Sequence, residues 1–408
     1  MKTKYNCFVD FGLEHVSILI AQIENNQLID VPLILNSKID ISANRPQSAM
    51  DQTENFETLL KLISEAEKRL HTYIFSIILV AKNKAIHLSF IRRKLEFKKQ
   101  QKISQTNREK LSISAIKIFN EQTNNRYNIL DIIYNNFILD EKTIVKNPYK
   151  MLCNSLILNA TMIGIKKTFT ANISSSLERL KLHIKHYISS CVATMDLLKN
   201  SLPVNGNFLL IDIGSSSTEY CILHNSCIVC LDLINLGGLD MTRDIASEMK
   251  WYINNADSVK KKIGNYRKNM ENSKDADVIE NIENIANERL REISTFVLKT
   301  INNKEPFKNT TFKKIYIFGG VSIYRNSKNI ISDIFGGTNV EILNVDNILN
   351  NSIIDGKIKE KDIKFENLQL FSALNFYINN LNIHKNARHG FLFKIPSKIS
   401  CFLKDILY

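Results

Sequence analysis

The sequence contains one short unit twice, about half a chain apart, and this duplication limits the fold more than any other feature. The first copy, Tyr5–Gly12, is an apolar strand-like run that ends in Asp-Phe-Gly. The second copy, Phe208–Gly214, is a similar run that ends in Asp-Ile-Gly. Further apolar runs follow each copy after a short turn, which is typical of strands joined in a meander. The sequence therefore predicts two related α/β halves, each with an Asp-x-Gly turn at the end of a strand.

A third strand-like run, Lys314–Gly320, ends in a double glycine. Glycines at strand ends let backbone N–H groups approach a phosphate or a nucleoside closely. Aspartates on two facing turns, here Asp10 and Asp212, suit Mg²⁺ bound through water, because hard cations prefer oxygen ligands. The alternative is that each aspartate only caps its turn, which is the better interpretation of either one alone. The duplicated context and the late Gly-Gly together favour contact with a nucleotide.

Composition narrows the class of protein without choosing a function. The 408 residues suggest about two to four domains. Apolar residues make up 44%, which excludes disorder of the whole chain, and the net charge of +13 favours acidic partners. No run approaches the roughly 18 apolar residues that span a bilayer, and the first residues do not resemble a secretion signal. The seven scattered cysteines fit reduced thiols, and Cys227 and Cys230 are expected on opposite faces of a strand.

Periodicity predicts the secondary structure around these motifs. Strands are expected over 5–10, 16–23, 28–35, 74–80, 130–139, 152–163, 208–214, 220–223, 228–233 and 314–318. Helices are expected over 54–70, 106–120 and 177–200, with another after the double glycine that runs to Ile331. The stretch 85–164 is more basic than its surroundings, but it has few aromatic residues and no nucleic-acid-binding pattern, so no nucleic-acid partner is expected.

Four segments together resemble the FtsA family of bacterial cell-division proteins, within the actin, sugar-kinase and chaperone ATPase superfamily. Asp212–Glu219 is similar to the second phosphate loop of that family, and Gly237–Ala246 to its GG-x-x-x-T-x-D-I-A segment. Ala256–Gly264 resembles the nucleotide segment, and Ile144–Met151 the Lys-Asn-Pro signature of an inserted subdomain. The resemblance implies an α/β fold: an actin-like, duplicated, two-lobed ATPase fold with an inserted α+β subdomain in the first lobe and a C-terminal amphipathic helix.

The resemblance also implies a division into domains. The first lobe would comprise 1–84 and 165–200, with the inserted subdomain at 85–164. The second-lobe core would comprise 201–250 and 311–381, with an outer subdomain at 251–310. Residues 382–408 would form a linker and a membrane-targeting helix.

By the same resemblance, ATP and Mg²⁺ are the expected cofactors, and no catalytic residue is expected. The residues expected at the ATP site are Asp10, Gly12, Asp212, Gly214, Ser215, Ser216, Thr218, Gly237, Gly238, Asp257, Lys260, Gly319 and Gly320, with Asp10 and Asp212 on Mg²⁺. The chain departs from the family in its first loop, where Leu13, Glu14 and His15 stand in place of the family's Thr, Ser and Lys, so the hydroxyl groups that would meet phosphate are missing. A carboxylate repels phosphate in a desolvated site, so weak nucleotide binding with weak or no hydrolysis is expected.

The C-terminal segment has the pattern of an interfacial helix. Residues 382–390 are polar and basic, as expected of a linker. Beyond Pro396 the apolar and basic residues separate onto two faces of a helix that is too short to span a bilayer. The residues expected to meet lipid are Lys394, Ile395, Lys398, Ile399, Phe402, Leu403, Lys404, Ile406 and Leu407. The alternative is a terminal helix docked on the protein's own core, which has the same pattern.

The resemblance implies a protein that tethers FtsZ filaments to the cytoplasmic face of the cell membrane at the division site. Its partners would be the acidic C-terminal peptide of FtsZ, further copies of itself in a polymer, anionic lipids and other division proteins. The peptide would dock near 247–310, where Lys260, Lys261, Lys262, Arg267 and Lys268 supply positive charge. Two other functions stay open: a small-molecule kinase of the same superfamily, and a scaffold for pilus assembly.

Overall fold

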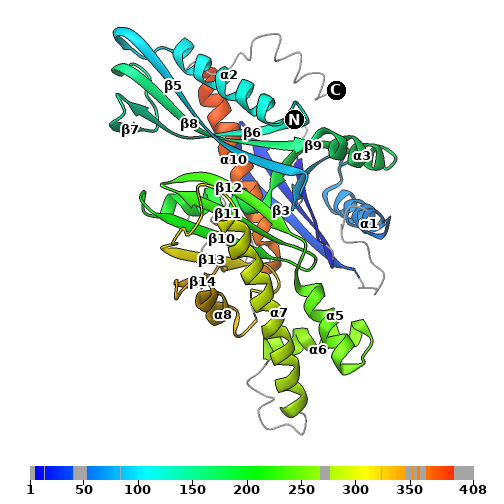
Figure 1. Cartoon of the computed structure of the whole chain (residues 1–408). Coiled ribbons are helices and arrows are strands. Elements are labelled where there is room, and N and C mark those ends of the chain that lie inside the picture. Colours follow the sequence, from blue (N-terminus) through cyan, green and yellow to red (C-terminus); the bar gives the residue numbers. More distant parts are fainter. Residues whose placement is uncertain are drawn as a thin grey trace.

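The computed structural model describes residues 5–389 apart from 13, 40–52, 83, 267–275, 323, 346–348, 350–351, 353–355 and 359–363. Two five-stranded sheets form the centre of the molecule, and a third sheet of four strands lies at one end (Figure 1). A group of helices extends from the opposite end (Figure 1). The two Asp-x-Gly units therefore belong to separate sheets, as the duplication predicts.

The first sheet has the strand order β3-β2-β1-β4-β9. Its strands are β1 (Tyr5–Phe11), β2 (His15–Glu24), β3 (Gln27–Lys38), β4 (Ser76–Ala81) and β9 (His183–Ser189). β1 pairs antiparallel with β2 and parallel with β4, so Asp10 lies opposite Val80 at the carboxyl end of both strands. Helices α1 (Thr53–Leu70) and α3 (Lys167–Glu178) pack against this sheet. Asp10 is thereby held at an edge where two parallel strands end.

The second sheet repeats this topology in the order β12-β11-β10-β13-β14. Its strands are β10 (Asn207–Ile213), β11 (Thr218–His224), β12 (Cys227–Ile234), β13 (Lys314–Phe318) and β14 (Val340–Ile342). β10 pairs antiparallel with β11 and parallel with β13, and Asp212 lies opposite Phe318. Helix α8 (Ser327–Ile334) packs against β14. Asp212 therefore has the same topological position in its sheet as Asp10 has in the first.

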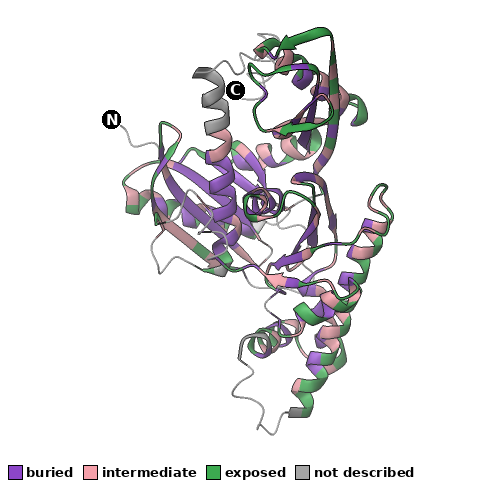
Figure 2. Ribbon diagram, turned by 90° about the vertical axis from the view of Figure 1, so that its left-hand side faces the viewer, coloured by how far each residue is buried: buried purple, intermediate pink, exposed green. Residues whose placement is uncertain are grey.

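Two helices join the sheets through a shared apolar core. Helix α10 (Leu368–His389), which follows the 3-10 turn Phe365–Asn367, contacts the first sheet. Helix α4 (Ser190–Leu198), which ends in the 3-10 turn Lys199–Ser201, contacts the second sheet and packs on α10. Figure 2 shows that the buried residues concentrate in these sheets and helices. The core side chains of α4 and α10 belong to one continuous cluster with both sheets, which ties the two lobes together.

The third sheet forms an inserted subdomain in the order β5-β8-β6-β7. Its strands are β5 (Ile86–Lys102), β6 (Tyr127–Leu139), β7 (Thr143–Val145) and β8 (Leu152–Lys166), and helix α2 (Gln105–Gln122) packs on β5 and β8. Asp131 attaches the insert to the first lobe, because it bonds His186 of β9 and Asn380 of α10. Thr161 attaches it to the second lobe by donating a hydrogen bond to the carbonyl of Ile228.

Three helices form an outer subdomain at the other end of the second lobe (Figure 1). They are α5 (Gly238–Met249), α6 (Ile253–Tyr266) and α7 (Ala276–Asn302). Their shared core consists of Ile245, Ala256, Ile263 and Ile282. The far half of α7 packs against the second sheet instead, which fixes the arm to the lobe.

Two predictions about secondary structure are wrong. Where a helix was expected over 177–200, the chain turns at Lys181 and then forms β9 and α4. His183–Ser189 pairs with β4, and this tertiary pairing overrides the local helical pattern. The linker expected over 382–390 is helical through His389, since α10 continues there. No glycine or proline interrupts that stretch before Gly390, and extending a helix that has already formed is favourable.

Among the described residues, no helix is long and apolar enough to cross a bilayer. The expected lipid-binding residues, 394–407, lie outside the described residues. Cys227 and Cys230 are both buried free thiols with different partners, Asn136 and Lys304, as their opposite orientation on a strand predicts.

Candidate functional site

A lysine at the end of β4 joins the first lobe to the second Asp-x-Gly turn. Lys82 directly follows β4 in the first lobe, and its Nζ lies 2.7 Å from Oδ2 of Asp212 in the second lobe. The Asp212 side chain is fully buried, and the Lys82 side chain is only 16% exposed. Gln369 Nε2 at the start of α10 donates a second hydrogen bond, 3.0 Å long, to the same oxygen. A carboxylate at the end of one lobe is thus neutralised by a cation from the other.

The surroundings of Asp212 shift the pKa of its carboxyl group upward despite this lysine. Burial raises the pKa of Asp212, the charge of Asp10 adds to this effect, and Lys82 opposes it. The second oxygen, Oδ1, accepts no hydrogen bond from the described residues. Nearby, burial raises the pKa of Glu219 to about 8, with Lys82 again opposing and Asp212 adding to the shift. The turn of the second lobe is therefore a desolvated acidic site that depends on one ammonium group for charge balance.

The turn of the first lobe is occupied by its own histidine. His15 Nε2 lies 3.4 Å from Oδ2 of Asp10. Partial burial lowers the pKa of His15, but the hydrogen bond to Asp10 and the charges of Asp10 and Glu14 raise it overall. A Cβ at Gly12 would lie 2.6 Å from the imidazole ring. Gly12 therefore leaves room for His15 beside Asp10, where the expected role was to leave room for a phosphate.

Glu14 reaches from the first lobe to two groups of the second. Its Oε1 accepts a hydrogen bond from the hydroxyl of Ser215 in the second Asp-x-Gly loop. Its Oε2 accepts one from Lys261 Nζ of α6, at 2.6 Å. The Glu14 side chain is 19% exposed and the Lys261 side chain 50% exposed, so the ion pair between them is partly open to water. A carboxylate therefore holds Ser215, a residue expected at the ATP site, together with an ammonium group.

Gly237 and Gly238, at the start of α5, allow this helix to pack closely against the second Asp-x-Gly loop. The N–H groups of Gly238 and Leu239 donate to the carbonyls of Gly214 and Ser215, at 2.8 and 2.7 Å. A Cβ at Gly237 would lie 2.5 Å from the Ser215 carbonyl oxygen. These N–H groups at the start of α5 are thus already bonded within the chain.

The α6 residues predicted to contact nucleotide form an ion-pair network. Asp257 lies 3.2 Å from Lys260 Nζ and 2.6 Å from Lys261 Nζ. Lys260 also donates to the Gly238 carbonyl and to Thr242 Oγ1, at 2.8 and 2.6 Å. Burial lowers the pKa of Lys260, and its contact with Asp257 opposes that shift. Lys260 therefore fixes α6 against the start of α5, and both Lys260 and Lys261 are engaged inside the site.

The remaining predicted residues differ in their surroundings. Thr218 is buried and donates to the Leu236 carbonyl, which is a structural contact. Ser216 is half-buried in the loop beside Ser215. Gly319 has φ +90°, and a Cβ there would lie 2.4 Å from the Ile213 carbonyl oxygen. Gly320 is exposed, and nothing lies within 4 Å of a Cβ built there. Of the two glycines in the Gly319-Gly320 pair, only Gly320 therefore faces open space.

These contacts test whether Mg²⁺ and a nucleotide phosphate fit the residues present. Among the described residues, no group of three or more His, Cys, Asp or Glu side chains is arranged to hold a metal ion. Asp212 is paired with the ammonium of Lys82, and Asp10 with the imidazole of His15. Both carboxylates expected to bind Mg²⁺ are thus already bonded to side chains of the chain itself. Ser215 and Lys261 are bonded to Glu14. As arranged here, the site does not fit a Mg²⁺–phosphate group.

Sequence reasoning missed Lys82, His15 and Gln369. A signal for Lys82 was present, because it directly follows a buried strand, and the carboxyl ends of parallel strands meet at one edge of a sheet. No local signal identifies Gln369, which reaches Asp212 only because α10 begins beside the second sheet. Glu14 was recognised as an unusual residue of the first loop, but not as one that bonds the second lobe.

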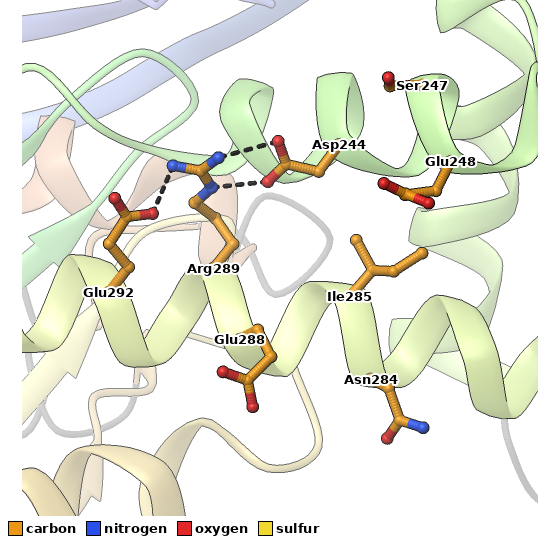
Figure 3. A pocket seen from close by; sticks show the side chains of 8 residues that line it. All are labelled: Asp244, Ser247, Glu248, Asn284, Ile285, Glu288, Arg289 and Glu292. Carbon is orange, nitrogen blue, oxygen red and sulfur yellow. Dashed lines mark hydrogen bonds and ion pairs between the residues drawn. The ribbon is translucent and has the colours of Figure 1, made fainter.

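A separate pocket lies in the outer subdomain between α5 and α7 (Figure 3). It is lined by Asp244, Ser247, Glu248, Asn284, Ile285, Glu288, Arg289 and Glu292. Arg289 forms a two-pronged ion pair with Asp244, with N–O distances of 2.6 and 2.8 Å, and also bonds Glu292 (Figure 3). The lining thus has four carboxylates and one guanidinium, so the pocket is acidic. The docking surface expected for this region was basic.

Comparisons with known proteins agree on the family resemblance and the fold. The family model for Cell division protein FtsA matches residues 209–358. The FtsA proteins of Bacillus subtilis (strain 168) and of Buchnera aphidicola subsp. Baizongia pistaciae are 22% and 23% identical over 63% and 65% of this chain. The alignments span 57% and 61% of those relatives, which is less than two thirds of their length.

The solved structure of a PilM-PilN type IV pilus biogenesis complex resembles the chain in fold. It is 15% identical, covers 93% of this chain and 98% of its own, and has a TM-score of 0.58. The chain is thus FtsA-like in sequence and has the actin-like ATPase fold, which confirms the α/β, actin-like fold class that the resemblance implied.

Proposed function

We propose that this protein is an FtsA-like scaffold of bacterial cell division, which works by binding partners rather than by turning over a substrate. The observation that carries the proposal is the match of residues 209–358, most of the second lobe, to the FtsA family model. The ion pairs within the expected nucleotide site favour a binding protein over a small-molecule kinase, because a kinase needs its phosphate-binding groups free.

The proposed partner is the C-terminal peptide of FtsZ, which would dock on the outer subdomain. Two of the five basic residues expected to receive it, Lys260 and Lys261, are engaged in the site between the lobes, while Lys262 is exposed. The carboxylate-lined pocket between α5 and α7 does not suit an acidic peptide, because like charges repel. We therefore propose that the peptide docks near Lys262 on α6.

Fluorescence anisotropy with a labelled FtsZ C-terminal peptide tests this docking. Lys262→Glu, on α6, should weaken binding at least about fivefold, because it places a negative charge against the acidic peptide. Lys61→Glu, on the exposed face of α1 in the first lobe, makes the same charge change and should leave the affinity unchanged. If the wild-type chain does not bind the peptide at all, the division role fails. If both variants bind like wild type, the docking surface lies elsewhere.

We further propose that residues 394–407 hold the protein on the inner face of the cell membrane. Several apolar side chains inserted partly into the interface, with lysines on anionic lipid at about 1 kcal/mol each, would bind reversibly. A polymer that displays many such segments would bind far more tightly. Co-sedimentation with phosphatidylglycerol vesicles tests this, comparing the full chain with one that ends at His389, the last residue of α10. Equal binding by the two chains would refute a membrane role for the tail.

A pilus-assembly scaffold is the second candidate, and the likeness in fold to the PilM-PilN complex favours it. That likeness extends over nearly the whole chain but rests on 15% identity. The FtsZ-peptide assay separates the two candidates, since only the division role predicts binding.

A further inference from the structure

The site between the lobes contains two charges of the chain itself at the places where a bound Mg²⁺–nucleotide would supply them. The positive charge is the Lys82 ammonium, which lies against Asp212, a residue expected to face the metal. The negative charge is the Glu14 carboxylate, which bonds Ser215 and Lys261, groups suited to a phosphate. Both side chains come from turns of the first lobe, and all three of their partners belong to the second.

We infer that Lys82 and Glu14 replace the divalent cation and the phosphate, so that the two lobes are held together without a Mg²⁺–nucleotide. Each side chain supplies the same type of interaction as the group it replaces. The Lys82 ammonium provides the positive charge that buried Asp212 requires, as a cation would, and the Glu14 carboxylate provides acceptor oxygens for a hydroxyl and an ammonium, as a phosphate would. This inference concerns the junction between the lobes and does not rest on the proposed role in division.

The close packing around both side chains supports the substitution. A Cβ at Gly214 would lie 2.7 Å from Lys82 Nζ, which is too close for any side chain. Only glycine at this position lets the second loop lie this near the lysine. The charge of Lys82 also opposes the raised pKa of Glu219, so it acts on two buried carboxyl groups. Glu14 has its second oxygen on Lys261, which also pairs with Asp257. Two separate sets of charges thus cross the junction, one from Lys82 and one from Glu14.

Thermal unfolding of the full chain, with Mg-ATP or with EDTA, tests the inference. A ligand that binds only the folded state at many times its Kd would raise Tm by about 5 °C or more. We expect wild-type Tm to change by less than about 1 °C under either condition. The double variant Lys82→Met with Glu14→Ser removes both internal charges and restores a hydroxyl to the first loop. We expect it to melt lower and to gain the Mg-ATP response, and EDTA should abolish that gain.

Matched substitutions and a second measurement complete the test. Lys84→Met with Glu57→Ser changes exposed residues of the same types and should behave like wild type. Small-angle scattering should show a larger radius of gyration for Glu14→Gln than for wild type, because the uncharged side chain weakens the link between the lobes. A wild-type Tm that rises by several degrees with Mg-ATP and falls again with EDTA would overturn the inference. So would a double variant that folds and does not respond to Mg-ATP.

Discussion

The ammonium of Lys82, one residue beyond β4 of the first lobe, lies 2.7 Å from a carboxylate oxygen of Asp212, near the end of β10 in the second lobe. The pair connects the first lobe to the second Asp-x-Gly turn, and Asp212 is fully buried. Because a buried carboxylate without a partner is costly, this contact should dominate the local energetics of the junction.

We expect Lys82→Ala to lower the free energy of unfolding by about 3–5 kcal/mol, the usual cost of leaving one member of a buried ion pair alone. Urea denaturation measures it. Lys84→Ala, at an exposed position two residues away, should change stability by no more than about 0.5 kcal/mol. The pair Lys82→Met with Asp212→Asn should cost less than Lys82→Ala alone, since no charge is left buried. Equal costs for Lys82→Ala and Lys84→Ala would contradict the geometry.

Stability should fall as pH rises from about 4.5 to 8. Burial raises the pKa of Glu219 from 4.5 to about 8, so in this range the folded chain keeps a proton that the unfolded chain releases. One such group gives a slope of at most about 1.4 kcal/mol per pH unit. Glu219→Gln should flatten the slope measured by urea unfolding between these pH values. Glu57→Gln, at an exposed site, should leave the slope as in wild type, and a variant at 219 with an unchanged slope would refute the assignment.

The two late glycines should respond differently to the same substitution. Gly319→Ala should cost at least about 2 kcal/mol, because φ is +90° and the new Cβ would lie 2.4 Å from the Ile213 carbonyl oxygen. Gly320→Ala should be close to neutral, since nothing lies within 4 Å of its Cβ. Thermal unfolding of the two variants side by side decides the matter. A Gly320→Ala variant as unstable as Gly319→Ala would argue against the described turn.

Asp131→Ala should loosen the inserted subdomain. The carboxylate lies 3.2 Å from His186 Nε2 of β9 and accepts a 3.1 Å hydrogen bond from Asn380 of α10, so its loss leaves two groups of the first lobe unpaired. We expect about 1–3 kcal/mol of destabilisation and faster amide hydrogen exchange in β6 and β8. Glu141→Ala removes an exposed ion pair with Lys94 inside the insert and serves as the control. Unchanged exchange in the Asp131 variant would show that other contacts hold the insert.

Much of the fold could be predicted because its signals are local. The strand runs that end in Asp10 and Asp212 are apolar, short and followed by turns, and a duplicated local pattern requires a duplicated topology. The helix expected over 177–200 failed for the opposite reason, because the choice between helix and strand at His183–Ser189 is made by β4, a strand about a hundred residues earlier. The linker predicted over 382–390 is wrong because a polar composition fits a linker and a solvated helix equally well, and helix extension needs no apolar face once the helix has formed.

The sequence by itself determined the duplicated α/β halves and the Asp-x-Gly turns at the ends of their strands, because these depend on the order and periodicity of residues along the chain. Only the tertiary structure decided what those residues contact. Charge balance in a buried site depends on which side chains come within about 3 Å of each other. The packing of the two sheets around α4 and α10 brings together the charged groups of the junction, which are Lys82, Glu14, Asp212 and Lys261. A residue pattern along the chain contains no such distance, so a site that the sequence predicts for a Mg²⁺–nucleotide is filled in the folded chain by its own charges.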